Sequence, residues 1–154
     1  MIVMYTDGAS SGNPGPGGFG TVLISAKHKL RRELSGGFRR TTNNRMELLA
    51  VIAGLEALKL PNSEVLVYSD SKYVVDAVEK GWLWGWQKKG FKGKKNPDLW
   101  KRFIPAYQKH QVKLQWVKGH AGIPENERCD QLAVEAGKSG KLLIDEGYES
   151  GAAG

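Results

Sequence analysis

Short apolar runs set the pattern of hydrophobic and polar positions along the chain. Residues 2–6 are apolar on both faces, which is typical of a central strand that is covered on both sides. Phe19–Ser25 and Leu30–Arg39 predict two strands joined by a tight polar turn, and Glu64–Ser69 and Lys113–Val117 predict a fourth and a fifth. We therefore expect the first three strands to form an antiparallel meander.

Helical segments alternate with the later strands. The clearest runs from Thr42 to Leu60, with a start at Asn44 and Glu47 that resembles a capping box, and with Pro61 as a stop. Further helices are predicted over Ser71–Lys80, Asp98–Lys109 (kinked or shifted by Pro105) and Pro124 to about Lys138. A strand–helix–strand connection of this length favours a parallel, right-handed crossover. The expected fold class is α/β: a five-stranded mixed sheet, three strands antiparallel and then two parallel, flanked by helices.

Glycine, proline and polar residues mark the irregular parts. Asp7–Gly18 is predicted to be a loop, Gly81–Asn96 an irregular basic and aromatic segment, and 146–154 a mobile tail of one domain that spans 1–154. No apolar run approaches the roughly 20 residues of a membrane span, and the N-terminus lacks the features of a signal peptide. A single cysteine, Cys129, excludes an internal disulfide, so we expect a reducing, cytoplasmic compartment. We also expect a monomer.

Positive charge is concentrated in one window. The chain carries a net charge of +7. Residues 80–118 hold 11 Lys or Arg and one acid, whereas the rest of the chain has 12 basic and 15 acidic residues. All five tryptophans lie in the same window. A basic patch mixed with aromatic residues is typical of a nucleic-acid surface, although charge alone would fit a solvated face equally well.

Four acids have both a structural and a catalytic interpretation. Asp7 precedes a glycine in a turn dipeptide, Glu47 could complete a capping box, Asp70 could cap a helix, and Asp130 could be a surface acid. Taken singly, each fits the structural interpretation better. Asp7 and Asp70, however, end the two central strands, so parallel pairing would bring both to the sheet edge where such folds bind ligands.

The other two acids lie on helix faces that are otherwise small and apolar. Glu47 shares its face with Ala50, Val51 and Gly54, and Asp130 shares its face with Ala133 and other small residues. Inward-facing acids are costly unless they are paired or bind metal. Oxygen ligands without a zinc-type Cys/His pattern point to Mg²⁺, with Mn²⁺ as a substitute. Two such ions about 3.5–4 Å apart can promote phosphodiester hydrolysis.

Several ordered motifs resemble bacterial ribonuclease HI. The resemblance runs in register from Ile2 to about Ala136. Its motifs are Tyr5-Thr6-Asp7-Gly8, Gly12 to Gly18, Thr41 to Glu47, Asp70-Ser71, Asp98-Leu99-Trp100, Trp116 to His120, and Glu125 to Asp130. The resemblance implies the ribonuclease H-like fold and an endoribonuclease that hydrolyses the RNA strand of RNA–DNA hybrids by two-metal-ion catalysis, largely independently of sequence.

The family's site residues carry over onto matching positions. Asp7, Glu47, Asp70 and Asp130 match its metal-binding catalytic acids, with Asp130 expected at the rim of the cluster beside His120. His120 matches a mobile histidine thought to assist proton transfer or product release. His28 and His110 have no such context and are interpreted as surface residues.

Substrate contacts are also implied by the resemblance. The hybrid's minor groove, where the 2′-OH can be read, would face Ser10, Asn13 and Asn44, while Thr42 and Asn43 would meet DNA phosphate and the minor groove. A basic protrusion would contact the DNA strand through six residues: Trp82, Trp86, Lys88, Lys89, Phe91 and Lys92. Lys72 stands where well-known members have glutamine, Gly85 stands where they have asparagine, and Lys92–Pro97 is shorter, which affects fine contacts rather than the reaction.

Three alternatives are open at the level of sequence. They are a non-catalytic binding module on the same fold, another enzyme of that fold such as a transposase, integrase or junction resolvase, and the nuclease domain of a reverse transcriptase. The presence of all four acids together with His120 argues against the first. The basic aromatic protrusion and the Trp116-to-Asp130 arrangement argue against the second.

Overall fold

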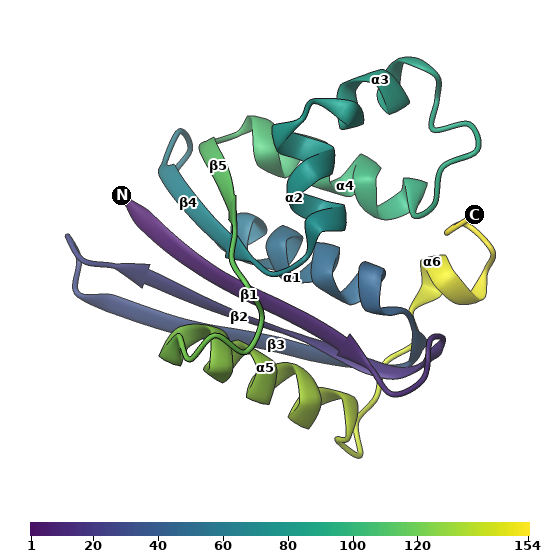
Figure 1. Ribbon diagram of the computed structural model, residues 1–154, viewed down its shortest axis with the longest axis horizontal. Coiled ribbons are helices and arrows are strands. Elements are labelled where there is room, and N and C mark those ends of the chain that lie inside the picture. Colours follow the sequence, from purple (N-terminus) through teal and green to yellow (C-terminus); the bar gives the residue numbers. More distant parts are fainter.

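A computed structural model describes all residues 1–154 and places five strands in one mixed sheet (Figure 1). The order across the sheet is β3-β2-β1-β4-β5. The strands are β1 (Ile2–Ser10), β2 (Gly15–Ser25), β3 (Leu30–Thr41), β4 (Glu64–Ser69) and β5 (Gln111–Trp116). β1 to β3 pair antiparallel, whereas β4 is parallel to both β1 and β5. The predicted fold class and mixed topology are therefore confirmed.

Helices cover both faces of this sheet. They are α1 (Asn43–Glu56), α2 (Lys72–Glu79), α3 (Trp82–Lys88), α4 (Pro97–Gln108), α5 (Pro124–Gly137) and α6 (Glu146–Glu149). Figure 1 shows α5 on one face, α1, α2 and α4 on the other, and α3 with its following loop projecting from the body. The largest core is a cluster of 24 buried apolar residues that includes Met4, Ile52, Val67 and Trp100. None of the helices combines the length and apolarity that a membrane crossing needs.

The glycine-rich stretch is mostly strand rather than loop. β1 and β2 remain paired as far as Ser10 opposite Gly17, so the predicted loop over Asp7–Gly18 shrinks to a short turn. The reason is helix packing: a Cβ on Gly18 would run into Ala133 of α5, and a Cβ on Gly20 would run into Cys129. These glycines let a helix lie directly on the strands.

Helix boundaries differ from the predictions at α1. This helix ends at Glu56, four residues before the predicted Leu60; Pro61 disfavours helical backbone at the residue before it. The expected capping box is absent, because the Thr42 side chain accepts the bond from the Arg45 amide, which leaves Glu47 free to point elsewhere.

Three other segments are more ordered or more buried than expected. Residues 81–96 contain α3, and residues 146–149 of the predicted tail form α6, with the Ala153 side chain buried. His110, expected on the surface, is only 8% exposed, and its Nδ1 accepts a hydrogen bond from the Ser63 amide. α4 is continuous through Pro105, whose side chain is exposed to solvent.

Candidate active site

The two central strands bring Asp7 and Asp70 together. β1 and β4 run parallel with Tyr5 beside Tyr68, and each aspartate follows its tyrosine by two residues. Asp70 lies just beyond the end of β4, as expected. Asp7 is not at a strand end, because β1 continues to Ser10 along β2; it lies just beyond the last residue of β1 paired to β4. Both side chains therefore leave the sheet at the same edge.

Glu47 joins this pair from the first turns of α1. Its side chain is only 8% exposed and accepts a hydrogen bond from the Gly8 amide, which also donates to Asp7 Oδ1 at 2.9 Å. A Cβ on Gly8 would collide with the backbone of Met46. Glycine at this position is thus what lets α1 approach β1 closely enough to bring the three carboxylates together.

Asp7, Glu47 and Asp70 form a cluster without a cationic side chain. One carboxylate oxygen from each lies within 4.8 Å of the others. Burial, then the nearby charges of Asp70 and Asp130, raise the pKa of Asp7 to about 7, although hydrogen bonds with Glu47 and Gly8 oppose the shift. Burial and contacts with Asp70 and Asp7 raise the pKa of Glu47 well above its usual range. No ion pair of the structure includes any of these three acids. Such a cluster favours a proton or a metal cation, so its donors fit a divalent ion.

Asp130 and His120 lie beside the triad. Asp130 projects from α5, and His120 belongs to the loop between β5 and α5. Together with Asp7 and Asp70 they line one small pocket. His120 is exposed and has a left-handed backbone with φ of 56°. At Gly119, a Cβ would lie 2.7 Å from Asp70 Oδ2, so this loop packs directly against the carboxylate.

Asn126 lines the same pocket and was missed at the level of sequence. It precedes Asp130 by one helical turn on α5, and its side-chain Oδ1 is buried without a hydrogen-bond partner. The spacing of four residues, which places both side chains on one face, was the available signal. An orphaned buried acceptor is rare in folded proteins, so Asn126 is a candidate for contact with a bound group.

Residues assigned to the minor groove gather next to the carboxylates. Asn43 Oδ1 accepts hydrogen bonds from the Ser10 amide at 2.7 Å and the Ser10 hydroxyl at 2.9 Å. Asn13 Oδ1 accepts from the Asn43 amide at 3.1 Å. Asn44 lines a shallow cleft that also contains the triad and Lys72. Thr42 is half-buried and engaged in capping α1.

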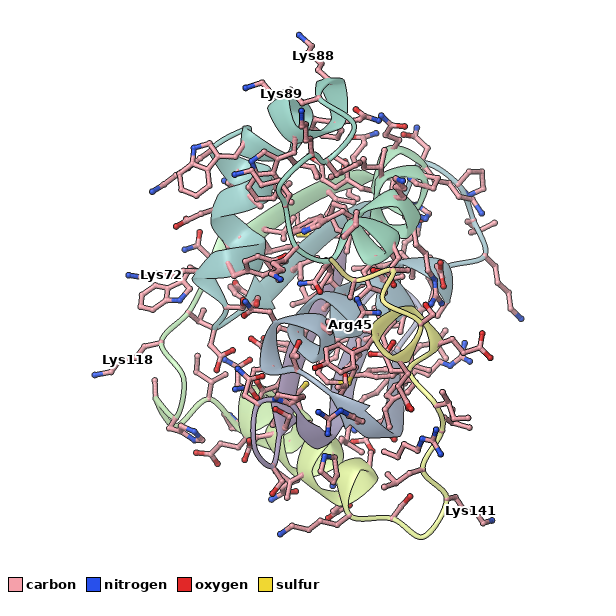
Figure 2. All side chains as sticks on the ribbon, turned by 90° about the vertical axis from the view of Figure 1, so that its right-hand side faces the viewer. Arg45, Lys72, Lys88, Lys89, Lys118 and Lys141 are labelled. Atoms are coloured by element: carbon pink, nitrogen blue, oxygen red, sulfur yellow. The ribbon has the colours of Figure 1, made fainter.

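Lys72 and Trp116 lie side by side next to Asp70. Lys72 is exposed, and its Nζ lies 4.7 Å from the centroid of the Trp116 ring. The Trp116 indole in turn donates to the Asp70 backbone carbonyl at 3.1 Å. Figure 2 shows Lys72 and Lys118 on the same side of the molecule, below Lys88 and Lys89.

The basic protrusion consists of α3 and the loop over 89–96. Trp82 is 50% exposed, and Lys88, Lys89 and Lys92 are also exposed, with Lys88 and Lys89 at the tip (Figure 2). Trp86 is half-buried and meets the edge of Trp100 at a centroid distance of 5.9 Å.

Phe91 does not fit its predicted role. It is only 6% exposed and belongs to the large apolar core. The chain turns inward there with a φ of 60° and a hydrogen bond from the Phe91 amide to the Trp86 carbonyl at 2.8 Å. Phe91 therefore anchors the protrusion from beneath, and its burial leaves little side-chain surface for contact with a DNA strand.

Comparisons with known proteins agree with this arrangement. The family model for RNase H matches residues 1–138. The chain is 58% identical over 149 residues to a ribonuclease H of Desulforamulus reducens, covering 94% of this chain and 92% of that one. It is 55% identical over 153 residues to a ribonuclease H of Trichodesmium erythraeum, covering 96% of each.

Solved structures resemble it as well. LC9-RNase H1, a type 1 RNase H with the type 2 active-site motif, has a TM-score of 0.80 and 34% identity, covering 99% of this chain and 81% of that one. LC11-RNase H1 in complex with an RNA/DNA hybrid has a TM-score of 0.64 and 29% identity, covering 88% and 96%.

Proposed function

The chain belongs to the RNase H family, and we propose that Asp7, Glu47, Asp70 and Asp130 hold the metal ions for its reaction, the hydrolysis of the RNA strand of RNA–DNA hybrids. The observation that carries this proposal is the triad of converging carboxylates with no cationic side chain among them. A non-catalytic module on this fold would have no use for buried acids whose charges repel one another.

Mg²⁺ is the proposed ion, and Mn²⁺ is the proposed substitute. The donors are carboxylate oxygens, the ligands that these hard cations prefer. No His or Cys side chain belongs to this group of potential ligands. When bound, the ions would supply an activated water and would stabilise the departing oxygen. The protein's own contribution is to hold the carboxylates in place through β1, β4 and α1.

Asp130 and His120 complete the site from the other side of the pocket. Asp130 would be a ligand at the rim of the cluster, since it projects from α5 rather than from the sheet. His120 would move a proton or help the product to leave. Its exposure and its place between Gly119 and Gly122, a glycine with φ of 81°, suit a mobile side chain.

The hybrid would be recognised on both sides of the carboxylates. Ser10, Asn13, Asn43 and Asn44 would meet the minor groove, where the 2′-OH distinguishes RNA from DNA, and Thr42 would meet DNA phosphate. Support comes from the hydrogen bonds that already tie Ser10, Asn13 and Asn43 into one surface. Lys72 would add a cation beside the cleft.

The protrusion would hold the DNA strand. Its exposed residues Trp82, Lys88, Lys89 and Lys92, together with the half-buried Trp86, offer stacking and phosphate contacts. Such contacts give affinity without sequence choice, so cleavage would be largely independent of sequence. We further infer that the chain acts as one catalytic domain and a monomer in the cytoplasm, where the single buried Cys129 would stay reduced.

One experiment tests the activity. The protein is incubated with Mg²⁺ and three duplexes of matched sequence: RNA–DNA hybrid, double-stranded RNA and double-stranded DNA. Cuts in the RNA strand of the hybrid alone are expected. Cleavage of double-stranded DNA, or an intact hybrid, would refute the proposal.

A second experiment tests the protrusion. Lys88→Ala should weaken binding to an uncleavable hybrid by a few-fold and reduce the slope of log affinity against log salt by roughly one. Lys141→Ala is the control, since Lys141 is exposed but lies at the opposite end of the molecule (Figure 2). Equal affinities and slopes for both variants would show that the protrusion does not contact the hybrid.

A further inference from the structure

The C-terminal segment 143–154, termed here the clasp, returns across the molecule and joins three separate parts of it. Figure 1 shows α6 beside the first turn of α1. Leu143 forms a bridge to β3 through two backbone hydrogen bonds of 2.9 Å, with Gly37 and Arg39. At the other end, the Ala153 carbonyl accepts from the Asn96 amide at 2.8 Å. The clasp therefore connects β3 to the base of the protrusion.

A buried arginine of α1 lies under the middle of the clasp. Arg45 is 1% exposed and points toward α6 (Figure 2). Its guanidinium makes two hydrogen bonds of 2.8 Å to Asp145 of the clasp, and two more, of 2.8 and 2.9 Å, to Asp98 in the first turn of α4. The Thr41 hydroxyl donates to Asp145 at 2.7 Å. The planar guanidinium is thus fixed in orientation by two bidentate carboxylates.

The side chains around Arg45 are tightly packed. A Cβ on Gly147 of α6 would collide with the Asp98 carboxylate and with the Arg45 guanidinium. Asn96 adds a further acceptor to Arg45 at 3.3 Å. Asn96 and Asp98 mark the place where the loop of the protrusion passes into α4, so Arg45 connects α1, the protrusion and the clasp at one point.

Arg45 lies on α1 close to residues that are proposed to take part in the reaction. It lies two residues before Glu47 and directly after Asn43 and Asn44. The same helical turn therefore carries a proposed metal ligand, two proposed minor-groove contacts and the buried guanidinium. A buried ion pair is weak evidence for stability alone, because apolar side chains of equal volume often stabilise as well.

We propose that Arg45, held by Asp98 and by Asp145 of the clasp, is a positioning residue that sets Glu47 relative to the protrusion. A hybrid bound on the protrusion then presents its RNA strand to the carboxylates in register. The inference rests on the function proposed above. Misplacement of reacting groups by about 1 Å can cost on the order of 100-fold in rate, so small shifts of this turn would reduce turnover.

The test compares two carboxylates of the clasp. Asp145→Asn removes the charge that faces Arg45. Glu149→Gln is the matched control, because Glu149 makes an equally bidentate pair with Arg39 of β3, at 2.8 and 2.9 Å, that is exposed and does not include Arg45. Both variants weaken the attachment of the clasp, but only the first disturbs Arg45.

Cleavage of the hybrid is measured under saturating Mg²⁺ at a temperature at which circular dichroism shows every variant folded. Asp145→Asn should lower kcat about tenfold with KM changed less than threefold, whereas Glu149→Gln should retain the wild-type kcat. Gly147→Ala provides a second route, since it displaces Asp98 from Arg45 and keeps every charge; it should reproduce the loss in kcat.

The outcomes separate the two proposals. If the wild type cleaves the hybrid, and Asp145→Asn and Gly147→Ala match Glu149→Gln in kcat while losing only thermal stability, the cluster is merely structural and the inference is overturned. If Asp145→Asn does not fold, Gly147→Ala alone decides in the same way. If the wild type itself leaves the hybrid intact, the proposed function fails first.

Discussion

Two clusters of carboxylates share the first turns of α1, and they are neutralised in opposite ways. Around Glu47, three acids converge with no cation among them. Around Arg45, two residues earlier, two acids enclose a buried guanidinium. Burial raises the pKa of Asp7 to about 7 and raises that of Glu47. Burial would also raise the pKa of Asp145, but hydrogen bonds from Arg45 and Thr41 outweigh it, and the pKa lies below its usual range.

This difference in neutralisation distinguishes a cluster that stabilises the fold from a cluster that binds a ligand. A cluster that contains its own cation is complete in the folded chain, and removal of the cation destabilises it. A cluster without one is incomplete until an ion arrives, so it costs stability and serves binding. Substitutions in and beside the two clusters test this contrast.

Asp70→Asn removes a ligand from the cation-free cluster. We expect kcat on the hybrid to fall roughly 1000-fold or more, with hybrid affinity changed only a few-fold because the phosphate contacts remain. Asp76→Asn is the control, since Asp76 pairs with Lys80 on the neighbouring α2. Undiminished cleavage by Asp70→Asn would refute the assignment of the metal site.

Arg45→Met removes the cation from the other cluster and leaves Asp98 and Asp145 facing each other. The free energy of unfolding in urea should fall by about 3–5 kcal/mol. Arg39→Met breaks the exposed pair with Glu149 and should cost less than about 1 kcal/mol. Equal unfolding free energies for the two variants would show that the buried Arg45 cluster stabilises the fold no more than the exposed pair does.

His120→Ala tests whether the cation-free cluster works alone. Because His120 lines the same pocket without belonging to the triad, turnover should slow by roughly 10- to 100-fold and remain measurable. His28→Ala, at an exposed histidine in the turn between β2 and β3, should be neutral. Complete loss of activity in His120→Ala would indicate a more central role.

The two clusters should respond oppositely to pH in the absence of metal. The folded-state pKa of Asp7 is raised, so its stabilising, protonated form is fully present below about pH 4 and is lost as pH rises through about 7. Asp145 has a lowered folded-state pKa, so its contribution is present above about pH 4 and is lost on acidification. At pH 8, metal-free Asp7→Asn should exceed the wild type in unfolding free energy by on the order of 1–3 kcal/mol.

Mg²⁺ provides the control for this measurement. Added Mg²⁺ should raise the Tm of the wild type more at pH 8 than at pH 5.5, and should raise that of Asp7→Asn much less. A metal-free Asp7→Asn that is less stable than the wild type at pH 8 would contradict the picture of repelling carboxylates.

Sequence patterns predicted the catalytic cluster better than the Arg45 cluster, for a physical reason. Asp7 and Asp70 each follow a readable apolar run, and the parallel pairing of these two runs alone brings them together. Arg45 meets partners 53 and 100 residues away in sequence. No periodicity links these positions, and Asp145 lies directly before the polar segment 146–154, whose composition predicts a mobile tail.

Local signals failed where packing decided the outcome. Gly18 lies in the segment predicted to be a loop, but it is a glycine because α5 lies against the strand. Phe91 lies among lysines and tryptophans and predicts a binding surface, yet it is buried in the core. In both cases the tertiary packing of the residue, which its neighbours in sequence do not reveal, decided the outcome.

The most direct test of the contrast is a crystal of the protein soaked with Mn²⁺ and measured for anomalous scattering. The anomalous difference map should show density among Asp7, Glu47 and Asp70, extending toward Asp130, and none between Asp98 and Asp145. Density absent from the triad, or present only beside Arg45, would contradict the account.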